Sequence, residues 1–181
     1  EIYTLSLHDV LPISWLVIDY KYKRIYSISG KRGITENINL TLSDYVKRRN
    51  GVPLGNSDSL SNMLNRSLGA GKFSIFWQYW NPIWGYYLGK YIFKPLKFIF
   101  PSALSLIITF VVCGFIHDLA IMLLKLKFTL LLTPWFLFMG LSVILGDYAK
   151  IDYSRFPWMA RAVINILVIS SCLLIAYQVR I

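Results

Sequence analysis

Residues 102–124 read SALSLIITFVVCGFIHDLAIMLL, an apolar run that contains one His and one Asp, His117 and Asp118, and no Lys, Arg or Glu. A helix that crosses a bilayer needs about 20 consecutive apolar residues, so this run predicts a membrane span. Ionisable side chains inside a span are costly to keep in lipid and mark functional sites by default. His117 and Asp118 are therefore candidate functional residues, and Gly114 is expected to leave room beside the imidazole. The structural alternative for His117 is a ring buried between helices and hydrogen-bonded to a hydroxyl or a carbonyl.

Two further apolar runs follow this one along the chain. Residues 128–145 contain Pro134 and predict a kinked span, and residues 162–177 predict a shorter span. Hydrophobic residues make up 56% of the chain and aromatic residues 16%, a composition that fits an integral membrane protein and not a nucleic-acid-binding protein. The expected fold class is all-α integral membrane, multi-pass, with about three transmembrane helices.

The basic residues are distributed unevenly along the chain. The formal net charge is +10, and 13 of the 19 Lys and Arg residues precede residue 102. If all three apolar runs cross the membrane, sixteen basic residues lie on one side and three on the other. Cytoplasmic loops carry the excess of Lys and Arg, so the polar N-terminal segment is expected in the cytoplasm. The expected location is a bacterial cytoplasmic membrane, with membrane lipids as partners and no nucleic acid.

The first fourteen residues are set apart from the remainder. Residues 1–14 read EIYTLSLHDVLPIS and resemble the in-frame translation of a sequencing adapter, so we exclude them as an artefact, as one excludes a tag. His8 is excluded with them, and any histidine-based chemistry must then use His117.

Residues 15–71 are polar, basic and rich in turn residues. Residues 15–28 alternate loosely between apolar and polar side chains, which fits either a short hairpin or the end of a membrane helix. The remainder predicts a water-exposed cytoplasmic loop with one or two short helices, such as residues 60–68. Its Gly69-Ala70-Gly71-Lys72 is not a phosphate-binding loop, because Phe73 stands where Ser or Thr is required. Residues 72–181 are expected to form the membrane domain.

Asn81-Pro82 predicts the start of a helix, because Asn caps free amides and Pro suits the first helical position. This helix is expected over residues 82–100, and Pro95 should kink or end it. Its aromatic cover and a basic stripe predict an amphipathic helix in the lipid headgroup region. The stripe consists of three lysines on one helical face, Lys90, Lys94 and Lys97.

Three motifs follow one another in the chain: FWQYWNP at residues 76–82, YIFKPL at residues 91–96 and GFIH at residues 114–117. In this order they resemble the membrane-bound O-acyltransferase (MBOAT) superfamily over residues 72–124. Members carry an aromatic motif that ends in Asn or His, an amphipathic segment that ends near Pro-Leu, and a His in the following helix. Since members usually have more than three spans, the resemblance implies the C-terminal part of such an enzyme or a reduced member.

Two details of these motifs bear on the branch of the superfamily. Asn81 is more similar to the sterol and diacylglycerol branch than to the polysaccharide-acylating branch, whose members usually have His there. Gly-Phe-Ile-His-Asp at residues 114–118 departs from the commoner Gly-Leu-Trp-His-Gly. These departures leave the identity of the acyl acceptor open.

The resemblance implies transfer of an acyl group from a thioester donor, acyl-CoA, to a hydroxyl acceptor. His117 would then be the general base, because a neutral imidazole can take the proton of the hydroxyl. Asn81 would position the substrate or donate a hydrogen bond to the oxyanion. Trp77, Trp80 and Asp118 are the expected substrate-binding residues. No metal and no resident cofactor are expected, since acyl-CoA is a co-substrate.

Other interpretations stay open at this point. Read alone, Asn81 is an ordinary helix cap. The chain is alternatively a non-enzymatic helical membrane protein, either a transporter part or an assembly partner, in which His117 and Asp118 line a polar pathway. A third alternative is an inactive fragment. The lysine stripe fits either the phosphates of CoA or anionic lipid headgroups.

Overall fold

The computed structural model describes residues 40–126, 128 and 130–179. The interpretations of residues 1–14 and 15–28, and those of the first part of the expected cytoplasmic loop, lie outside the described residues. All contacts given below lie within the unit that begins at Thr41.

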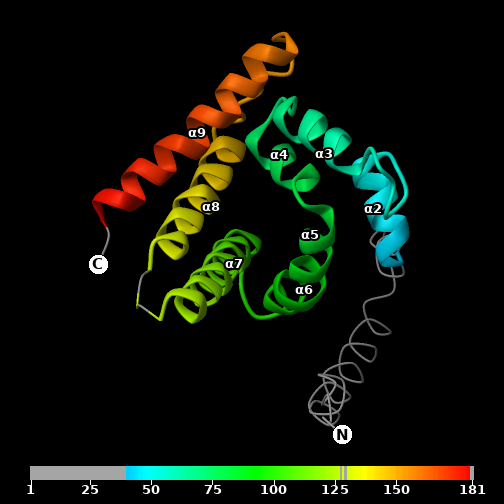
Figure 1. Cartoon of the computed structure of the whole chain (residues 1–181). Helices are drawn as coiled ribbons and strands as arrows, with labels where there is room; N and C mark the ends of the chain where they lie inside the picture. The colour runs from blue at the N-terminus through cyan, green and yellow to red at the C-terminus, as the bar shows by residue number, and fades with distance from the viewer. Residues whose placement is uncertain (1–39, 127, 129, 180–181) are drawn as a thin grey trace, which may run out of the picture. The chain divides into compact units, whose positions relative to one another are not determined.

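The described residues form helices and no strands, which confirms the all-α prediction for this part of the chain (Figure 1). The elements are α2 Leu42–Asn50, α3 Ser59–Leu68, α4 Phe73–Tyr79, α5 Pro82–Leu88, the π-helical turn η2 Gly89–Phe93, α6 Lys94–Leu96, α7 Ser102–Lys125, α8 Leu132–Tyr148 and α9 Trp158–Gln178.

Two helices, α2 and α3, occupy the described part of the expected loop. α2 begins after Thr41, whose hydroxyl oxygen accepts an N–H of the first turn at 3.2 Å. It ends at Gly51, whose φ of 85° suits glycine because that residue has no Cβ. At the end of α2, buried Asn50 donates to the hydroxyl and the carbonyl of Ser59 at 2.7 and 2.9 Å. This side chain ties α2 to the start of α3, the short helix that the sequence predicts here.

The helix that starts at Pro82 changes its geometry just before Pro95 and ends one residue after that proline. In η2 the N–H of Lys94 donates to the carbonyl of Gly89, five residues earlier, so the helix widens into a π turn. Proline has no N–H, and its ring crowds the carbonyl four residues before it. A wider turn at this place accommodates the proline. The helix then returns to α geometry and ends at Leu96, before the predicted end.

The loop after α3 is held by residues at the start of α9. Asn165 is buried, and its Nδ2 donates to the carbonyls of Leu68 and Ala70 at 2.9 and 3.0 Å. Its Oδ1 accepts the hydroxyl of Tyr153 at 2.6 Å, so both polar atoms of this amide are hydrogen-bonded. Burial, and then the charge of Asp152, raises the pKa of Tyr153 to about 12.

Gly69 and Gly71 lie against the same segment. A Cβ added to Gly69 would come within 2.5 Å of the Trp158 ring, and one on Gly71 within 2.5 Å of Ser154. Close approach of two chain segments therefore accounts for these two glycines, which belong to the pattern that the sequence analysis rejected as a phosphate-binding loop.

The apolar core lies between α4, α8 and α9. Phe73 and Phe76 of α4 pack in one cluster with Met139 and Val143 of α8 and with Cys172 of α9. The aromatic motif thus contributes directly to the packing that positions α8. α7 packs along α8 on the side that carries the candidate site.

Among the described residues, two helices, α7 and α9, are long and apolar enough to cross a membrane. Within their most apolar windows only 28% and 22% of the residues are buried. The core helices of soluble proteins are mostly buried, so these two exposed apolar helices point to membrane association. α8 has 17 residues, at the lower limit of the lengths that cross a bilayer. Pro134, which the sequence analysis expected to kink it, lies in its first turn, where no helical hydrogen bond is lost.

Candidate functional site

His117 is an exposed residue of α7. Its Nδ1 atom lies 2.7 Å from the carbonyl oxygen of Cys113, one turn earlier in the same helix. A carbonyl oxygen can only accept a hydrogen bond, so Nδ1 carries the proton. In the neutral ring, Nε2 is then the nitrogen with a free electron pair. This is the arrangement that a general base requires.

Two aromatic rings from other helices contact the imidazole. Phe136 of α8 stacks on it, with ring centroids 5.3 Å apart and planes at 25°. Trp84 of α5 meets the imidazole edge to face, with centroids 6.0 Å apart and planes at 84°. α7, α8 and α5 therefore meet at His117, and the two rings restrict the orientations open to its side chain.

Asn81 is the N-cap of α5, as the Asn-Pro pair predicts. Its Oδ1 accepts the backbone N–H of Trp84 at 3.2 Å. Its φ of 39° lies in the left-handed region, which Asn tolerates better than most residues do. An N–H donor must meet the oxygen of the amide, so Nδ2 is the remaining donor of this exposed side chain.

Trp84 connects the two candidate catalytic residues. Its backbone N–H bonds to Asn81, and its indole Nε1 donates to the Sγ atom of Cys113 at 3.1 Å. The carbonyl of the same cysteine binds His117. Within the described ranges no hydrogen bond joins Asn81 directly to His117, so Trp84 is the link between them.

Asp118 binds the start of the neighbouring helix, α8. It is buried, and its carboxylate accepts the N–H groups of Leu131, Leu132 and Thr133 at 3.2, 2.9 and 2.7 Å, and the Thr133 hydroxyl at 2.7 Å. The first N–H groups of a helix have no partner within it, and a negative charge there also favours the helix dipole. Asp118 therefore caps α8, and its expected contact with substrate stays a prediction.

Gly114 brings α7 close to the start of α8. A Cβ at this position would lie 2.7 Å from the carbonyl oxygen of Leu132, 2.8 Å from the Cα of Thr133 and 2.9 Å from the Cβ of Phe136. The space that glycine was expected to leave beside His117 is therefore occupied by α8. Its consequence is the close packing that brings Phe136 onto the imidazole.

Two tryptophans were expected to bind substrate, Trp77 within α4 and Trp80 at the C-terminal cap of α4, and their surroundings differ. The ring of Trp77 lies 6.0 Å from that of Phe136, on which His117 stacks. Trp77 Nε1 is buried and has no hydrogen-bond partner among the described residues. Trp80 stacks on Phe76 of its own motif at 5.5 Å. The structure thus connects Trp77 to the candidate site through Phe136, whereas the ring contact of Trp80 is local.

Three residues of this site were not predicted from the sequence: Trp84, Cys113 and Phe136. The capping rule could have identified the backbone N–H of Trp84, because an N-cap side chain bonds to the second or third residue of its helix. The Cys113 thiol accepts its hydrogen bond from the indole of Trp84, 29 residues earlier in the chain. The side-chain contacts join different helices, and no local spacing signals them.

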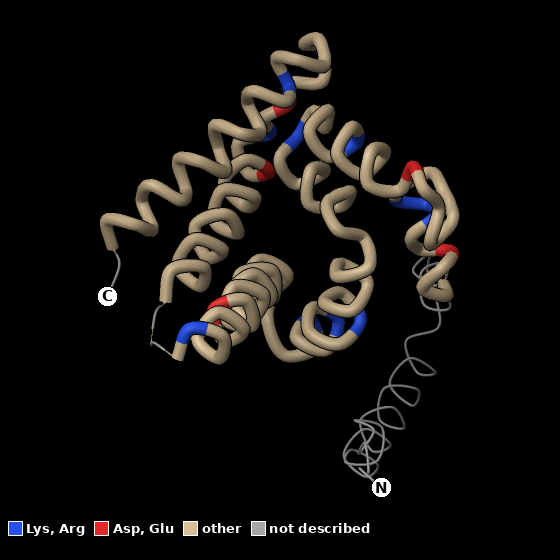
Figure 2. Tube along the Cα trace, viewed as in Figure 1, with Lys and Arg blue, Asp and Glu red and all other residues tan. Residues whose placement is uncertain are grey.

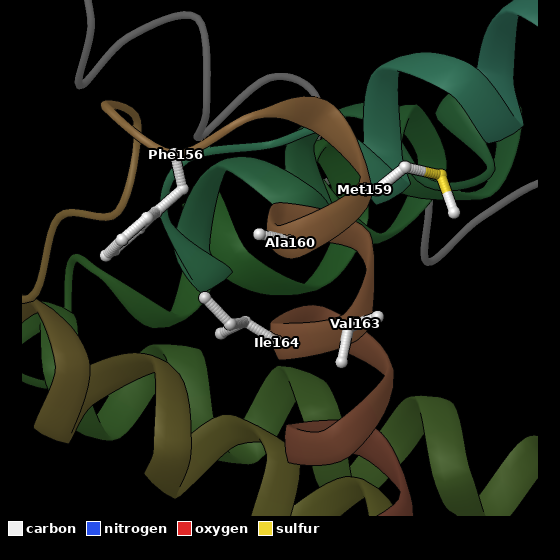
Figure 3. A pocket seen from close by; sticks show the side chains of 5 residues that line it. All are labelled: Phe156, Met159, Ala160, Val163 and Ile164. Carbon is white, nitrogen blue, oxygen red and sulfur yellow. The ribbon is translucent and has the colours of Figure 1, made fainter.

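A separate apolar depression of about 360 Å³ lies at the start of α9 (Figure 3). Figure 3 shows only apolar side chains around it, so it offers no acid, base or nucleophile. Its lining consists of Phe156, Met159, Ala160, Val163 and Ile164. In the part of the chain that the structure describes, no group of three or more His, Cys, Asp or Glu residues is placed to hold a metal ion.

A comparison of the chain with protein-family models, curated proteins and solved structures found no match. The function is therefore inferred from the geometry around His117 and from the chemistry of its neighbours.

Proposed function

We propose that this chain is a membrane-embedded acyltransferase related to the MBOAT superfamily, with His117 as its general base. One observation carries most of the support, the 2.7 Å hydrogen bond between His117 Nδ1 and the Cys113 carbonyl. This bond leaves Nε2 as the acceptor on an exposed side chain, and a hydroxyl substrate needs such an acceptor to lose its proton.

The exposed apolar side chains of α7 and α9 support the membrane location. Leu124 of α7 is 85% exposed and Leu174 of α9 is 65% exposed. Exposure of such side chains to water costs free energy, whereas contact with lipid chains does not. In the proposed arrangement α7, α8 and α9 are three spans, with the polar segment before them in the cytoplasm of a bacterial cell.

In the proposed reaction a hydroxyl oxygen of the acceptor attacks the carbonyl carbon of the thioester. His117 Nε2 takes the hydroxyl proton as the new C–O bond forms, and the carbonyl oxygen becomes an oxyanion. The C–S bond then breaks, and the imidazolium gives its proton to the departing thiolate. The products are an ester and free CoA, so the step needs no oxidant, metal or further cofactor.

Asn81 would stabilise the oxyanion in this reaction. Its Oδ1 is already bonded to the Trp84 N–H, so the direction of its Nδ2 donor is determined before substrate binds. Donors held in place in this way stabilise a developing negative charge without reorganisation during the reaction. Trp77 lies one ring away from His117 and would line the apolar path of the acyl chain.

The test uses the full chain expressed in membranes, with radiolabelled palmitoyl-CoA as the acyl donor. Transfer of label to hydroxyl-bearing lipids is measured by thin-layer chromatography, and release of the CoA thiol is measured in parallel. The His117→Ala variant should lose at least about a hundredfold in transfer rate, the effect of removing a general base. Resistance of the variant to carbonate extraction checks that it still inserts.

Leu123→Ala is the matched control, because Leu123 lies in the same helix and is exposed. This variant should retain the transfer rate. Full transfer by His117→Ala, or no transfer by the unaltered chain with either palmitoyl-CoA or acetyl-CoA, would contradict the proposed function.

The non-enzymatic alternative, a polar pathway lined by His117 and Asp118, receives less support. Both carboxylate oxygens of Asp118 are engaged by the start of α8. Neutralising Asp118 would therefore disturb α8 whether or not anything is transported, so the loss of a transport activity in that variant would not identify a pathway.

A further inference from the structure

The segment from α5 to α6 carries positive charge without nearby acidic residues in the sequence. The chain has no Asp or Glu between Asp58 and Asp118, and this interval includes Lys90, Lys94 and Lys97. Figure 2 shows basic positions gathered at the end of this segment and no acidic position within it. An excess charge of this kind attracts anions.

Two tyrosine rings hold the ammonium group of Lys90. Its Nζ lies 5.6 Å from the centroid of Tyr86 and 5.3 Å from that of Tyr91. Cation–π contacts position an ammonium group but leave its full charge in place, because an aromatic ring carries no net charge. Lys90 is therefore a positioned cation on the surface of η2.

Lys94 lies one turn further along, on the same face as Lys90. Burial, and then the charge of Lys90, lowers the pKa of Lys94. Two ammonium groups that repel each other gain stability when an anion with several oxygens binds both of them. A phosphate group is such an anion.

The residues that follow α6 are apolar and exposed. Ile99 is 73% exposed, with Phe98 and Phe100 on either side of it. α7, which is long and apolar enough to cross a membrane, begins at Ser102 directly after them. Lysines and tyrosines next to exposed apolar side chains, at the start of a span, are typical of the membrane–water interface.

We propose that Lys90 and Lys94 bind the headgroup phosphate of an anionic phospholipid, while the three residues from Phe98 to Phe100 enter the acyl-chain region. The occupant is a lipid because the charged and the apolar parts of the segment lie in the order that a lipid presents them, headgroup and then chain. This inference goes beyond acyl transfer, since it needs neither His117 nor a bound donor.

The test uses the purified full chain in dodecyl maltoside. Dioctanoyl phosphatidylglycerol is titrated as the anionic probe and dioctanoyl phosphatidylcholine as the zwitterionic one, and the dissociation constant is measured by thermophoresis. We expect selective binding of phosphatidylglycerol that weakens as salt rises. The double variant Lys90→Gln, Lys94→Gln should bind phosphatidylglycerol roughly thirtyfold more weakly. Each basic residue near anionic lipid strengthens binding by roughly fivefold, and this variant loses two.

Two further double variants sharpen the test. Lys90→Arg with Lys94→Arg keeps both charges and should retain binding. Lys125→Gln with Lys150→Gln removes two lysines from other parts of the chain and should also retain it. Equal affinity for both lipids, or unchanged affinity in the Lys90 and Lys94 double glutamine variant, would overturn the proposal.

Free CoA serves as the second source of phosphate in the same assay. If CoA displaces phosphatidylglycerol and loses affinity through the same two substitutions, the site belongs to the acyl donor and the lipid assignment is wrong. Failure of the lipid assignment is distinguishable from failure of the proposed acyl transfer, which is measured separately through His117→Ala.

Discussion

The Nδ1 atom of His117 lies 2.7 Å from the carbonyl oxygen of Cys113, one turn earlier in α7. The helix itself thus selects the tautomer of the imidazole, because only a protonated Nδ1 can bond to a carbonyl. The thiol of the same Cys113 binds Trp84, whose backbone N–H is capped by Asn81. A single residue of α7 therefore connects the imidazole with the helix that carries the other candidate catalytic group.

Asn81 has two roles that substitutions can separate. Asn81→Asp keeps an oxygen for the Trp84 N–H but loses the Nδ2 donor, whereas Asn81→Ala loses both. If Nδ2 stabilises the oxyanion, Asn81→Asp should lower the transfer rate by about a hundredfold or more at nearly unchanged thermal stability. Asn81→Ala should in addition destabilise the protein by about 1 kcal/mol through loss of the cap. Full transfer by Asn81→Asp would show that the residue is only a cap.

Asp118 should be required for stability. Asp118→Ala leaves three N–H groups and a hydroxyl at the start of α8 without their acceptor, which we expect to cost about 2–4 kcal/mol. Asp118→Asn keeps one acceptor oxygen, so its loss of stability should be smaller than that of Asp118→Ala. The measurement is the thermal unfolding midpoint of the chain in detergent. An unchanged midpoint together with lost acyl transfer would instead indicate a direct contact of Asp118 with substrate.

Gly114 should not tolerate a methyl group. In Gly114→Ala the new Cβ meets backbone atoms of Leu132 and Thr133 at 2.7 and 2.8 Å, and backbone cannot move aside as a flexible side chain can. We expect a net destabilisation of about 1–3 kcal/mol. Gly146→Ala is the matched control in α8, because a Cβ there meets nothing within 4 Å. The control should be neutral or slightly more stable, since Ala is the better helix former.

Tyr153 should make stability depend on alkaline pH. Burial and the charge of Asp152 raise its pKa from the ordinary value of 10 to about 12 in the folded protein. A raised folded pKa adds stability that is fully present below pH 10 and is lost as the pH rises from about 10 to about 12. Tyr153→Phe lacks this titration and the hydrogen bond to Asn165. The unaltered protein should therefore be more stable than Tyr153→Phe below pH 10, and this difference should shrink between pH 10 and about 12 in thermal unfolding measurements.

The local features of the chain are those that the sequence by itself determined. The apolar length of α7 and α9, the helix start at Asn81-Pro82 and the all-helical character follow from composition and from contacts between residues a few positions apart. The expected site residues His117 and Asn81 also come from the sequence, although their roles depend on the resemblance of the motifs. The π turn before Pro95 was not predictable from the sequence, because it is one of several ways in which a helix accommodates proline.

The partners of each side chain were decided only by the tertiary structure. Asp118 and His117 are adjacent in the sequence, yet the carboxylate turns to the start of α8 while the imidazole lies between Trp84 and Phe136. Gly114 was expected to leave space beside His117, but it lies in close contact with the start of α8. The physical reason is that helical periodicity specifies which residues share a face, whereas the helix that packs on that face depends on contacts across the whole chain.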